Sequence, residues 1–187
     1  MKCSVFIATS TDGYIARPDG AVDWLHSAGN GQTIEGDKAD MGFQHYISSV
    51  DCMIMGRKTM QTISSMDLSP DQWIYGDLRI IVLSQSLKEA PENLRDKVEL
   101  YHGDLQDLLA SLEAEGFHHA YIDGGATIQS FLSLQLINEM TITLAPILLG
   151  EGIPLFGKTG KDIHLQQAES TAFANDFVQV KYKVNYK

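Results

Sequence analysis

The chain has 187 residues, of which 44% are hydrophobic and 20% are charged. This length and composition suit a globular protein with one sizeable core, so we expect a single domain over residues 1–187. Fourteen Lys and Arg stand against 24 Asp and Glu, which gives a formal net charge of −10. A field of that sign repels nucleic acid and anionic membranes, so we expect neither as a partner, and local groups must hold any anionic ligand.

The cysteines and the start of the chain favour a cytoplasmic location. Cys3 and Cys52 both lie in apolar runs, where buried thiols are more common than a disulfide framework or a metal site. The six histidines are scattered along the chain, so we expect no metal. The apolar run after Met1 is too short for a signal peptide or a membrane span.

Strand and helix patterns alternate through the first two thirds of the chain. Helical spacing predicts helices over 38–49 and 59–63, and apolar runs predict strands over 3–9, 50–55, 79–83 and 98–101. The clearest helix follows Asp104, a plausible N-cap. Leucines recur there at helical spacing, at 105, 108, 109 and 112, and Gly116 closes the pattern.

The last third of the chain ends in strands. A helical stretch begins at Ile128, a long strand is predicted over 140–149, and two final strands are predicted over 162–173 and 177–185. Strands that alternate with helices imply parallel pairing, whereas the closing pair implies an antiparallel edge. The sequence therefore predicts an α/β protein built on a mixed, mostly parallel sheet.

A first glycine turn follows the apolar run that ends at Met55. Gly56 is followed at once by Arg57, Lys58 and Thr59. A strand that enters a helix in this way can place backbone N–H groups, two cations and a hydroxyl around one phosphate. The alternative is a solvated turn that binds nothing.

A second glycine turn follows the apolar run that ends at Asp123. Gly124 and Gly125 lead into Ala126, Thr127 and a helical pattern. The spacing does not match G-x-G-x-x-G, so the Rossmann fingerprint is not supported. The alternative is that the glycines serve only a tight turn. In mixed sheets of this kind, however, ligands sit beyond the carboxyl ends of the strands, which is where both turns fall.

Several segments, in order, carry a family resemblance. They are residues 5–8, 12–16, 55–59, 81–84, 123–125, 136–140 and 145–156. Together they resemble the dihydrofolate reductase superfamily, and the last is most similar to the reductase domain of the bacterial bifunctional riboflavin-biosynthesis deaminase/reductase. The resemblance implies a three-layer α/β/α fold with a mixed central sheet and an antiparallel C-terminal edge, without a deaminase domain.

The resemblance also implies NADPH as hydride donor. Arg57 would pair with the 2′-phosphate of the adenine ribose. Lys58, Thr59 and the N–H groups of the second glycine turn would meet the pyrophosphate. Ser84 would add a hydroxyl near the adenosine phosphate, unless it is an ordinary turn residue, and backbone groups of Ala8 and Ile15 would hold the nicotinamide. The expected cofactor residues are Ala8, Ile15, Gly56, Arg57, Lys58, Thr59, Ser84, Asp123, Gly124, Gly125, Ala126 and Thr127. A cis peptide is expected on one side of Gly124.

On the substrate side, the resemblance implies roles for Asp40 and Trp24. Asp40 stands where dihydrofolate reductase carries its substrate carboxylate, which would bind an amidine-like edge and favour protonation of the reduced bond. Its alternative is a surface position on a helix. Trp24 matches a tryptophan of the substrate loop, and its alternative is a place in the core.

The chain departs from both branches of the superfamily. The helix before the first glycine turn offers Gln44, His45 and Tyr46 where the riboflavin reductases carry basic residues, which puts a phosphoribosyl substrate in doubt. Dihydrofolate reductase has a basic residue and an aromatic where this chain has Ala126 and Ile128. We expect an NADPH-dependent oxidoreductase that acts on a C=N or C=O bond of a pterin- or aminopyrimidine-like heterocycle. The alternatives are dihydrofolate reductase activity proper or a nucleotide-binding protein that has lost catalysis. A homodimer is expected, because the riboflavin branch pairs through its C-terminal strands.

Overall fold

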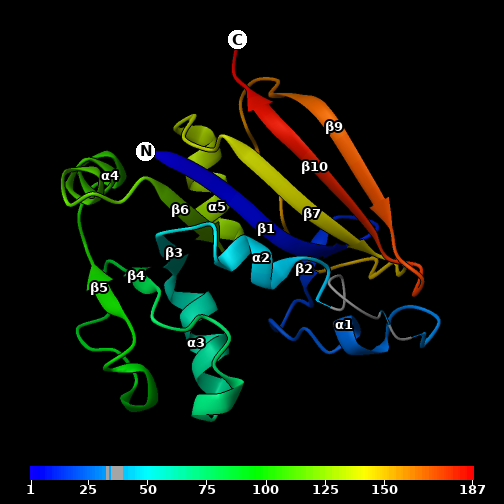
Figure 1. Ribbon diagram of the computed structural model, residues 1–187, viewed down its shortest axis with the longest axis horizontal. Coiled ribbons are helices and arrows are strands. Elements are labelled where there is room, and N and C mark those ends of the chain that lie inside the picture. Colours follow the sequence, from blue (N-terminus) through cyan, green and yellow to red (C-terminus); the bar gives the residue numbers. More distant parts are fainter. Residues whose placement is uncertain (33, 35–39) are drawn as a thin grey trace.

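The computed structural model of the protein describes residues 1–32, 34 and 40–187 (Figure 1). An eight-stranded sheet has the order β5-β4-β3-β6-β1-β7-β10-β9. Its strands are β1 (Lys2–Ser10), β3 (Cys52–Gly56), β4 (Arg79–Leu83), β5 (Glu99–Tyr101), β6 (His119–Asp123), β7 (Glu139–Ala145), β9 (His164–Ala172) and β10 (Val178–Asn185). A small second sheet pairs β2 (Tyr14–Ala16) with β8 (Ile153–Pro154).

The large sheet is mixed, as the sequence predicts. The strands from β5 to β7 pair in parallel. The last two pairings, β7 with β10 and β10 with β9, are antiparallel, and in Figure 1 these long strands form one end of the sheet. The expected strand over 140–149 stops earlier, at Ala145, because Pro146 has no N–H to donate to a ladder.

Helices cover both faces of the sheet. The helices are α1 (Trp24–Ser27), α2 (Phe43–Ile47), α3 (Arg57–Ser65), α4 (Leu105–Ala114) and α5 (Gly125–Ser133), with short 3₁₀ turns at Pro70–Gln72 and Glu92–Leu94. Apolar side chains of α4 and α5 pack with Val5, Ile54 and Ile122 of the sheet. Those of α2 and α3 pack with Met53 and Tyr121, on the opposite face. The predicted three-layer α/β/α arrangement is confirmed.

The helix α4 shows how local signals select the structure. The side chain of Asp104 accepts hydrogen bonds from the N–H groups of Gln106 and Asp107, at 2.7 and 3.3 Å. Leu108 and Leu112 are buried on its inner face. The N-cap and the apolar stripe predicted this helix, and both are confirmed.

The helix α2 is shorter than the sequence suggests. It spans five residues, and Gly42 before it has φ +87°. That left-handed conformation ends any continuous helix through position 42. Residues 38 and 39 of the expected helix lie outside the described part of the chain.

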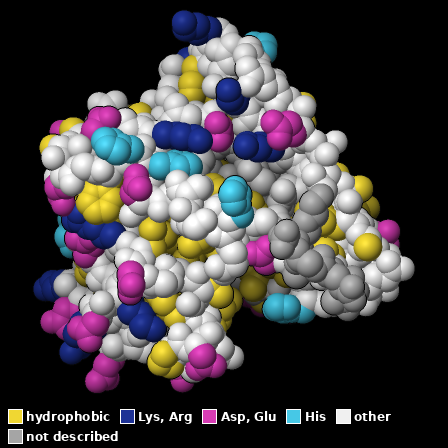
Figure 2. All heavy atoms as spheres, in the orientation of Figure 1, with side chains coloured by type: hydrophobic (Ala, Val, Ile, Leu, Met, Phe, Trp, Pro, Cys, Tyr) yellow, Lys and Arg dark blue, Asp and Glu magenta, His cyan; other side chains and the backbone are white. Residues whose placement is uncertain are grey.

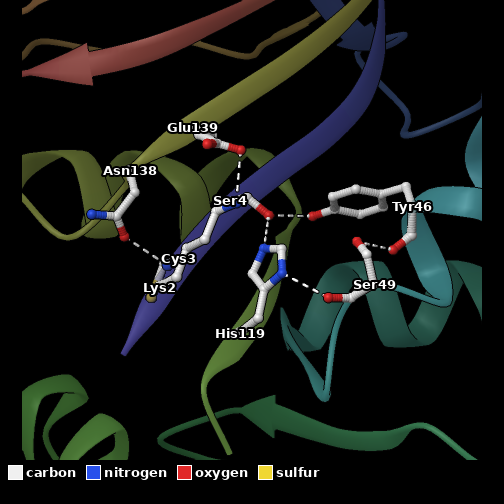
Figure 3. Close-up of polar contacts among 8 residues, drawn as sticks. All are labelled: Lys2, Cys3, Ser4, Tyr46, Ser49, His119, Asn138 and Glu139. Carbon is white, nitrogen blue, oxygen red and sulfur yellow. Dashed lines mark hydrogen bonds and ion pairs between the residues drawn. The ribbon is translucent and has the colours of Figure 1, made fainter.

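A polar network ties α2 to the sheet (Figure 3). The Ser4 hydroxyl of β1 lies 2.8 Å from the Tyr46 hydroxyl of α2 and 2.7 Å from His119 Nε2 of β6. His119 Nδ1 lies 2.8 Å from the Ser49 carbonyl oxygen, so Nδ1 carries the ring proton and Nε2 accepts from Ser4. Burial lowers the pKa of His119, which keeps the ring neutral and the network in this form.

Candidate active site

The two glycine turns lie side by side at the carboxyl ends of neighbouring strands. β3 pairs with β6 in parallel, and Met55 lies opposite Asp123. Gly56 and Gly124 follow these two residues directly. The fold therefore brings together two segments that are almost seventy residues apart in the sequence.

Each turn presents the N-terminus of a helix without a side-chain cap. α3 begins after Gly56 and α5 begins after Gly124, each helix has nine residues, and neither has a capping side chain or an acidic residue in its first turn. The first N–H groups of both helices are therefore left for another acceptor. Two such ends at one place have the geometry and partial charge to bind an anion.

The glycines are required by close packing between the turns. A Cβ atom at Gly56 would lie 2.8 Å from Thr127 Oγ1, and one at Gly124 would overlap Thr59 Oγ1. A Cβ atom at Gly125 would lie 2.9 Å from Ile15 Cδ1. The prediction of a cis peptide beside Gly124 is wrong, because every peptide bond in the described ranges is trans. Gly124 turns the chain instead through φ +90°, which glycine alone adopts easily.

A cleft of about 1020 Å³ runs past both turns. All of the residues expected to bind cofactor line it: Ala8, Ile15, Gly56, Arg57, Lys58, Thr59, Ser84, Asp123, Gly124, Gly125, Ala126 and Thr127. Hydrophobic side chains gather at the indentation between the parts of the molecule that hold α3 and α1, and charges of both signs are dispersed over this face (Figure 2). The local groups of the cleft, and not the overall charge, must therefore attract an anion.

Arg57 and Lys58 supply positive charge at this cleft. Both side chains are exposed, and neither forms an ion pair with another described residue. Unpaired cations at an uncapped helix N-terminus fit the phosphates of a dinucleotide.

Ser84 has a structural task in addition to its place in the cleft. Its hydroxyl oxygen accepts hydrogen bonds from the N–H groups of Ser86 and Leu87, at 3.3 and 2.9 Å. This is the turn that was the alternative interpretation of Ser84. The hydroxyl proton still has no acceptor among the described residues, so Ser84 can also donate to a ligand.

Asp12 holds the wall of the cleft near Ile15. Its carboxylate accepts from the N–H groups of Leu149 and Gly150, at 3.1 and 2.8 Å, and from the Ser10 hydroxyl. The hydrogen bond from Ser10 is the main cause that lowers the pKa of Asp12. These bonds join the loop before β2 to the loop before β8, and Ile15 of β2 lies next to Gly125 of the second glycine turn.

A smaller cavity of about 410 Å³ adjoins the cleft, and Ala8 and Leu25 line both. Asp40 lines the smaller cavity, and its oxygens accept from the N–H groups of Gly42 and Gln44, at 2.9 and 2.5 Å. Asp40 thus stabilises the start of α2 and also faces a cavity. None of the described residues that line this cavity is a Lys or Arg.

Trp24 is not part of either cavity wall. Its side chain is fully buried and packs with Ala145 and Phe177. The core position, the alternative interpretation of Trp24, is the one that the structure shows. The indole ring buries its large apolar area there.

Asp123 stands out among the groups of the cleft. Burial raises its pKa from 3.8 to about 6, and contacts with the Gly124 N–H and with Tyr121 oppose the shift. The Tyr121 hydroxyl already donates to the Phe6 carbonyl oxygen at 2.9 Å, so it has no second proton for Asp123. A carboxyl with such a pKa can hold and release a proton near neutral pH. The sequence pointed to Asp123 only as a neighbour of the glycines.

Within 1–32, 34 and 40–187, no three His, Cys, Asp or Glu side chains meet in an arrangement that could hold a metal ion. No helix of the same ranges is both long and apolar enough to span a bilayer.

Comparisons with known proteins show which family the chain belongs to. The family model of the RibD C-terminal domain matches residues 2–179. The chain is 31% identical over 183 residues to YwjB of Bacillus subtilis (strain 168), described as an uncharacterized protein, with 97% of each chain covered. It is 42% identical to a putative riboflavin biosynthesis protein from Shewanella sp. PV-4, with a TM-score of 0.88 and 99% of each chain covered.

More distant structures share the fold. RibD of Acinetobacter baumannii is 19% identical with a TM-score of 0.70, and the match covers 98% of this chain and 58% of that one. The riboflavin biosynthesis reductase Rib7 of Saccharomyces cerevisiae is 12% identical with a TM-score of 0.65, and covers 98% and 90%. The architecture is that of dihydrofolate reductase-like α/β proteins. The chain belongs to the family of the RibD C-terminal domain, the reductase-like domain of riboflavin biosynthesis.

Proposed function

We propose that the protein is an NADPH-dependent reductase of a pterin- or aminopyrimidine-like heterocycle, similar in reaction to the reductases of riboflavin biosynthesis. The observation that carries the proposal is the pair of uncapped helix N-termini with free Arg57 and Lys58 at one cleft. Two helix N-termini that can each bind an anion suit a ligand with several phosphates. The relationship to the RibD C-terminal domain supports the same assignment.

Different residues of the cleft bind different parts of the cofactor. Arg57 holds the 2′-phosphate, and Lys58, Thr59 and the N–H groups at the start of α5 hold the pyrophosphate. Ala8 and Ile15 receive the nicotinamide, because both line the cleft and Ala8 also lines the smaller cavity. Bound there, NADPH supplies the hydride.

Reduction of a C=N or C=O bond also needs a proton, and Asp123 is the group we assign to it. Its raised pKa, about 6, leaves the carboxyl protonated in a useful fraction of molecules near neutral pH. Asp123 lines the same cleft as the cofactor residues. Asp40 then binds the heterocycle from the smaller cavity. That Asp40 also assists protonation stays a prediction, which substitutions of Asp40 and of Asp123 test.

The smaller cavity favours a substrate without a phosphate. Its described lining carries the acidic Asp40 and no Lys or Arg. A carboxylate repels a phosphate dianion and attracts N–H donors of a heterocycle. We therefore propose that a ribosyl or free heterocycle is reduced in preference to its phosphorylated form.

The test is a spectrophotometric screen of NADPH oxidation. The substrates are dihydrofolate, dihydropterin, and 5-amino-6-ribosylaminouracil with and without its 5′-phosphate. We expect oxidation with a pterin or aminouracil and a preference for the compound without phosphate. NADPH binding without oxidation of any of them would indicate a nucleotide-binding protein that has lost catalysis.

A further inference from the structure

The side chain of Gln179, on β10, supports the turn that carries Asp40. Its amide nitrogen donates to the Met41 carbonyl oxygen and to Thr143 Oγ1, each at 3.0 Å. Gln179 and Thr143 are partners in the pairing of β10 with β7. Met41 and Thr143 line the smaller cavity, whereas Gln179 does not. Gln179 therefore holds two residues of the cavity wall without being part of that wall.

The two hydrogen bonds fix the orientation of the Gln179 amide. A carbonyl oxygen only accepts hydrogen bonds, so the amide nitrogen, and not the amide oxygen, must face Met41. That nitrogen carries two hydrogens, and the hydrogen bonds to Met41 and Thr143 use both. The amide thus has one orientation, and it holds the Met41 carbonyl in one direction.

The peptide group that Gln179 holds also binds the Asp40 carboxylate. The Met41 carbonyl and the Gly42 N–H belong to one planar trans peptide, so they point in opposite directions. The Gly42 N–H donates to Asp40 Oδ1 at 2.9 Å. A chain of hydrogen bonds therefore runs from Gln179 through this peptide to the carboxylate, and each bond polarises the next.

The turn at Met41 and Gly42 is not stable by itself. Both residues have positive φ, +56° and +87°, and a residue with a side chain seldom adopts that conformation. The helix α2 that follows has only five residues, too few to hold its own start. Loss of the hydrogen bond from Gln179 would free the peptide to rotate and turn the Gly42 N–H away from Asp40.

We propose that Gln179 is a positioning residue of the substrate cavity, which orients the peptide between Met41 and Gly42 so that the Asp40 carboxylate faces N–H donors of the heterocycle. This inference rests on the proposed reductase function and deepens it. Asp40 is exposed at the cavity, so its hydrogen bonds to the backbone decide where its oxygens point. Asp40 contacts the substrate, and Gln179 acts only through Asp40.

The probe is 5,6-diaminouracil, which presents amino and ring N–H donors. It is titrated by calorimetry into the protein saturated with NADP⁺. Gln179→Met keeps the length of the side chain and removes both donors, so the probe should bind about tenfold more weakly while NADP⁺ affinity stays unchanged. Gln179→Glu keeps the shape but, when ionised, offers no hydrogen to Met41, and it should weaken the probe at least as much.

Gln106→Met is the matched control. Gln106 is exposed on α4 and lines neither the cleft nor the smaller cavity. The same exchange of side chains at this position should leave the affinities for NADP⁺ and for the probe at their wild-type values.

A double-mutant cycle with Asp40→Asn tests whether Gln179 acts through Asp40. Once the carboxylate is gone, Gln179→Met has nothing left to misplace and should weaken the probe by less than about twofold. A merely structural role of Gln179 would instead weaken the probe by the same factor with Asp40 and with Asn at position 40.

Four results would overturn the inference alone. They are a wild type that binds NADP⁺ but not the probe, Gln179 variants that bind the probe within about twofold of the wild type, Gln179 variants that lose NADP⁺ affinity as much as probe affinity, and equal factors in the two backgrounds of the cycle. Failure of the wild type to bind NADP⁺ would instead refute the proposed function.

Discussion

Gly124 lies so close to the hydroxyl of Thr59 that any side chain at position 124 would overlap it. The reciprocal contact joins Gly56 to the hydroxyl of Thr127, which would lie 2.8 Å from an added Cβ. Each glycine turn thus packs against a threonine of the other turn's helix. The two glycine turns therefore pack as one unit, and a change in either should affect both.

The first prediction concerns Gly124→Ala. The methyl group meets Thr59 Oγ1 and the residue must hold φ +90°, so the turn shifts and NADPH affinity should fall by at least about a hundredfold. Fluorescence titration with NADPH measures this. Gly116→Ala is the control, because Gly116 has φ +95° with no atom within 4 Å of its added Cβ. The control should lose about 1 kcal/mol of stability and no affinity. Equal affinity in both variants would show that the turn is only structural.

Arg57→Ala should weaken the binding of NADPH much more than the binding of NADH. Loss of a charge-assisted contact to the 2′-phosphate costs about 1.5–3 kcal/mol, or roughly ten- to hundredfold in NADPH affinity, and leaves NADH affinity nearly unchanged. Competition titrations with both dinucleotides measure the difference.

Arg95→Ala is the matched control for the charge. Arg95 is exposed, does not line the cleft, and its removal changes the net charge equally. The control should bind both dinucleotides as the wild type does. If Arg57→Ala weakened NADPH and NADH to the same extent, the 2′-phosphate assignment would be wrong.

Local patterns in the sequence predicted most of the fold. Asp104, the leucine stripe and Gly116 define α4 without help from the rest of the chain, so this helix could be read directly. The sequence did not show where α2 begins, because a glycine inside a helical pattern can be tolerated and only its φ of +87° shows that it is not. The end of β7 was missed although Pro146 marked it.

The site was predictable only in part, for a physical reason. The glycine turns carry local signals, and the parallel pairing of β3 with β6 brings them together. Tyr75, which lines the cleft, lies in an irregular turn, where no periodicity marks a residue. The raised pKa of Asp123 arises from desolvation by distant segments, which one sequence does not reveal. From the sequence, Trp24 could lie either in the core or in the wall of a pocket, and only the packing of the folded chain shows that it lies in the core.

Asp123→Asn should stabilise the protein while it removes turnover. The folded-state pKa is raised from 3.8 to about 6, so the folded state binds the proton more tightly, and the wild type loses stability as the pH rises from about 4 to about 6, with no further loss above that. The variant should be more stable than the wild type by about 1–3 kcal/mol near pH 8, and the difference should vanish below about pH 4. Urea unfolding across this range measures it.

Turnover should fall by about 10²–10⁴ in the same variant, because the proton donor is lost. A variant that is no more stable than the wild type near pH 8 would contradict the burial of an ionised carboxylate at position 123. Full turnover with the expected gain in stability would leave Asp123 without a role in proton transfer.

We propose a homodimer that covers the edge strand β9. Nearly every residue of β9 is exposed, and Leu165 on it is 43% exposed. A long open edge strand with an exposed leucine is a liability for a monomer. We expect wild-type protein to sediment as a dimer and Leu165→Lys as a monomer. Leu134→Lys, at an equally exposed leucine after α5, should remain dimeric. A wild-type monomer at tens of micromolar would refute the proposal.

Asp40 needs two substitutions, because it both caps α2 and lines the smaller cavity. Asp40→Asn removes the charge and keeps one of the two oxygens that accept at the start of α2, so the protein should lose less stability than it does with Asp40→Ala. If the carboxylate binds N–H donors of the heterocycle, KM should rise by roughly ten- to hundredfold with kcat and NADPH affinity nearly unchanged. Asp40→Ala removes the cap as well and should lose about 1 kcal/mol of stability. Steady-state kinetics and thermal unfolding separate the two effects. A fall in kcat of about 10²–10⁴ in Asp40→Asn would move the proton-transfer role from Asp123 to Asp40, whereas unchanged kinetics in both variants would reduce Asp40 to the cap of α2.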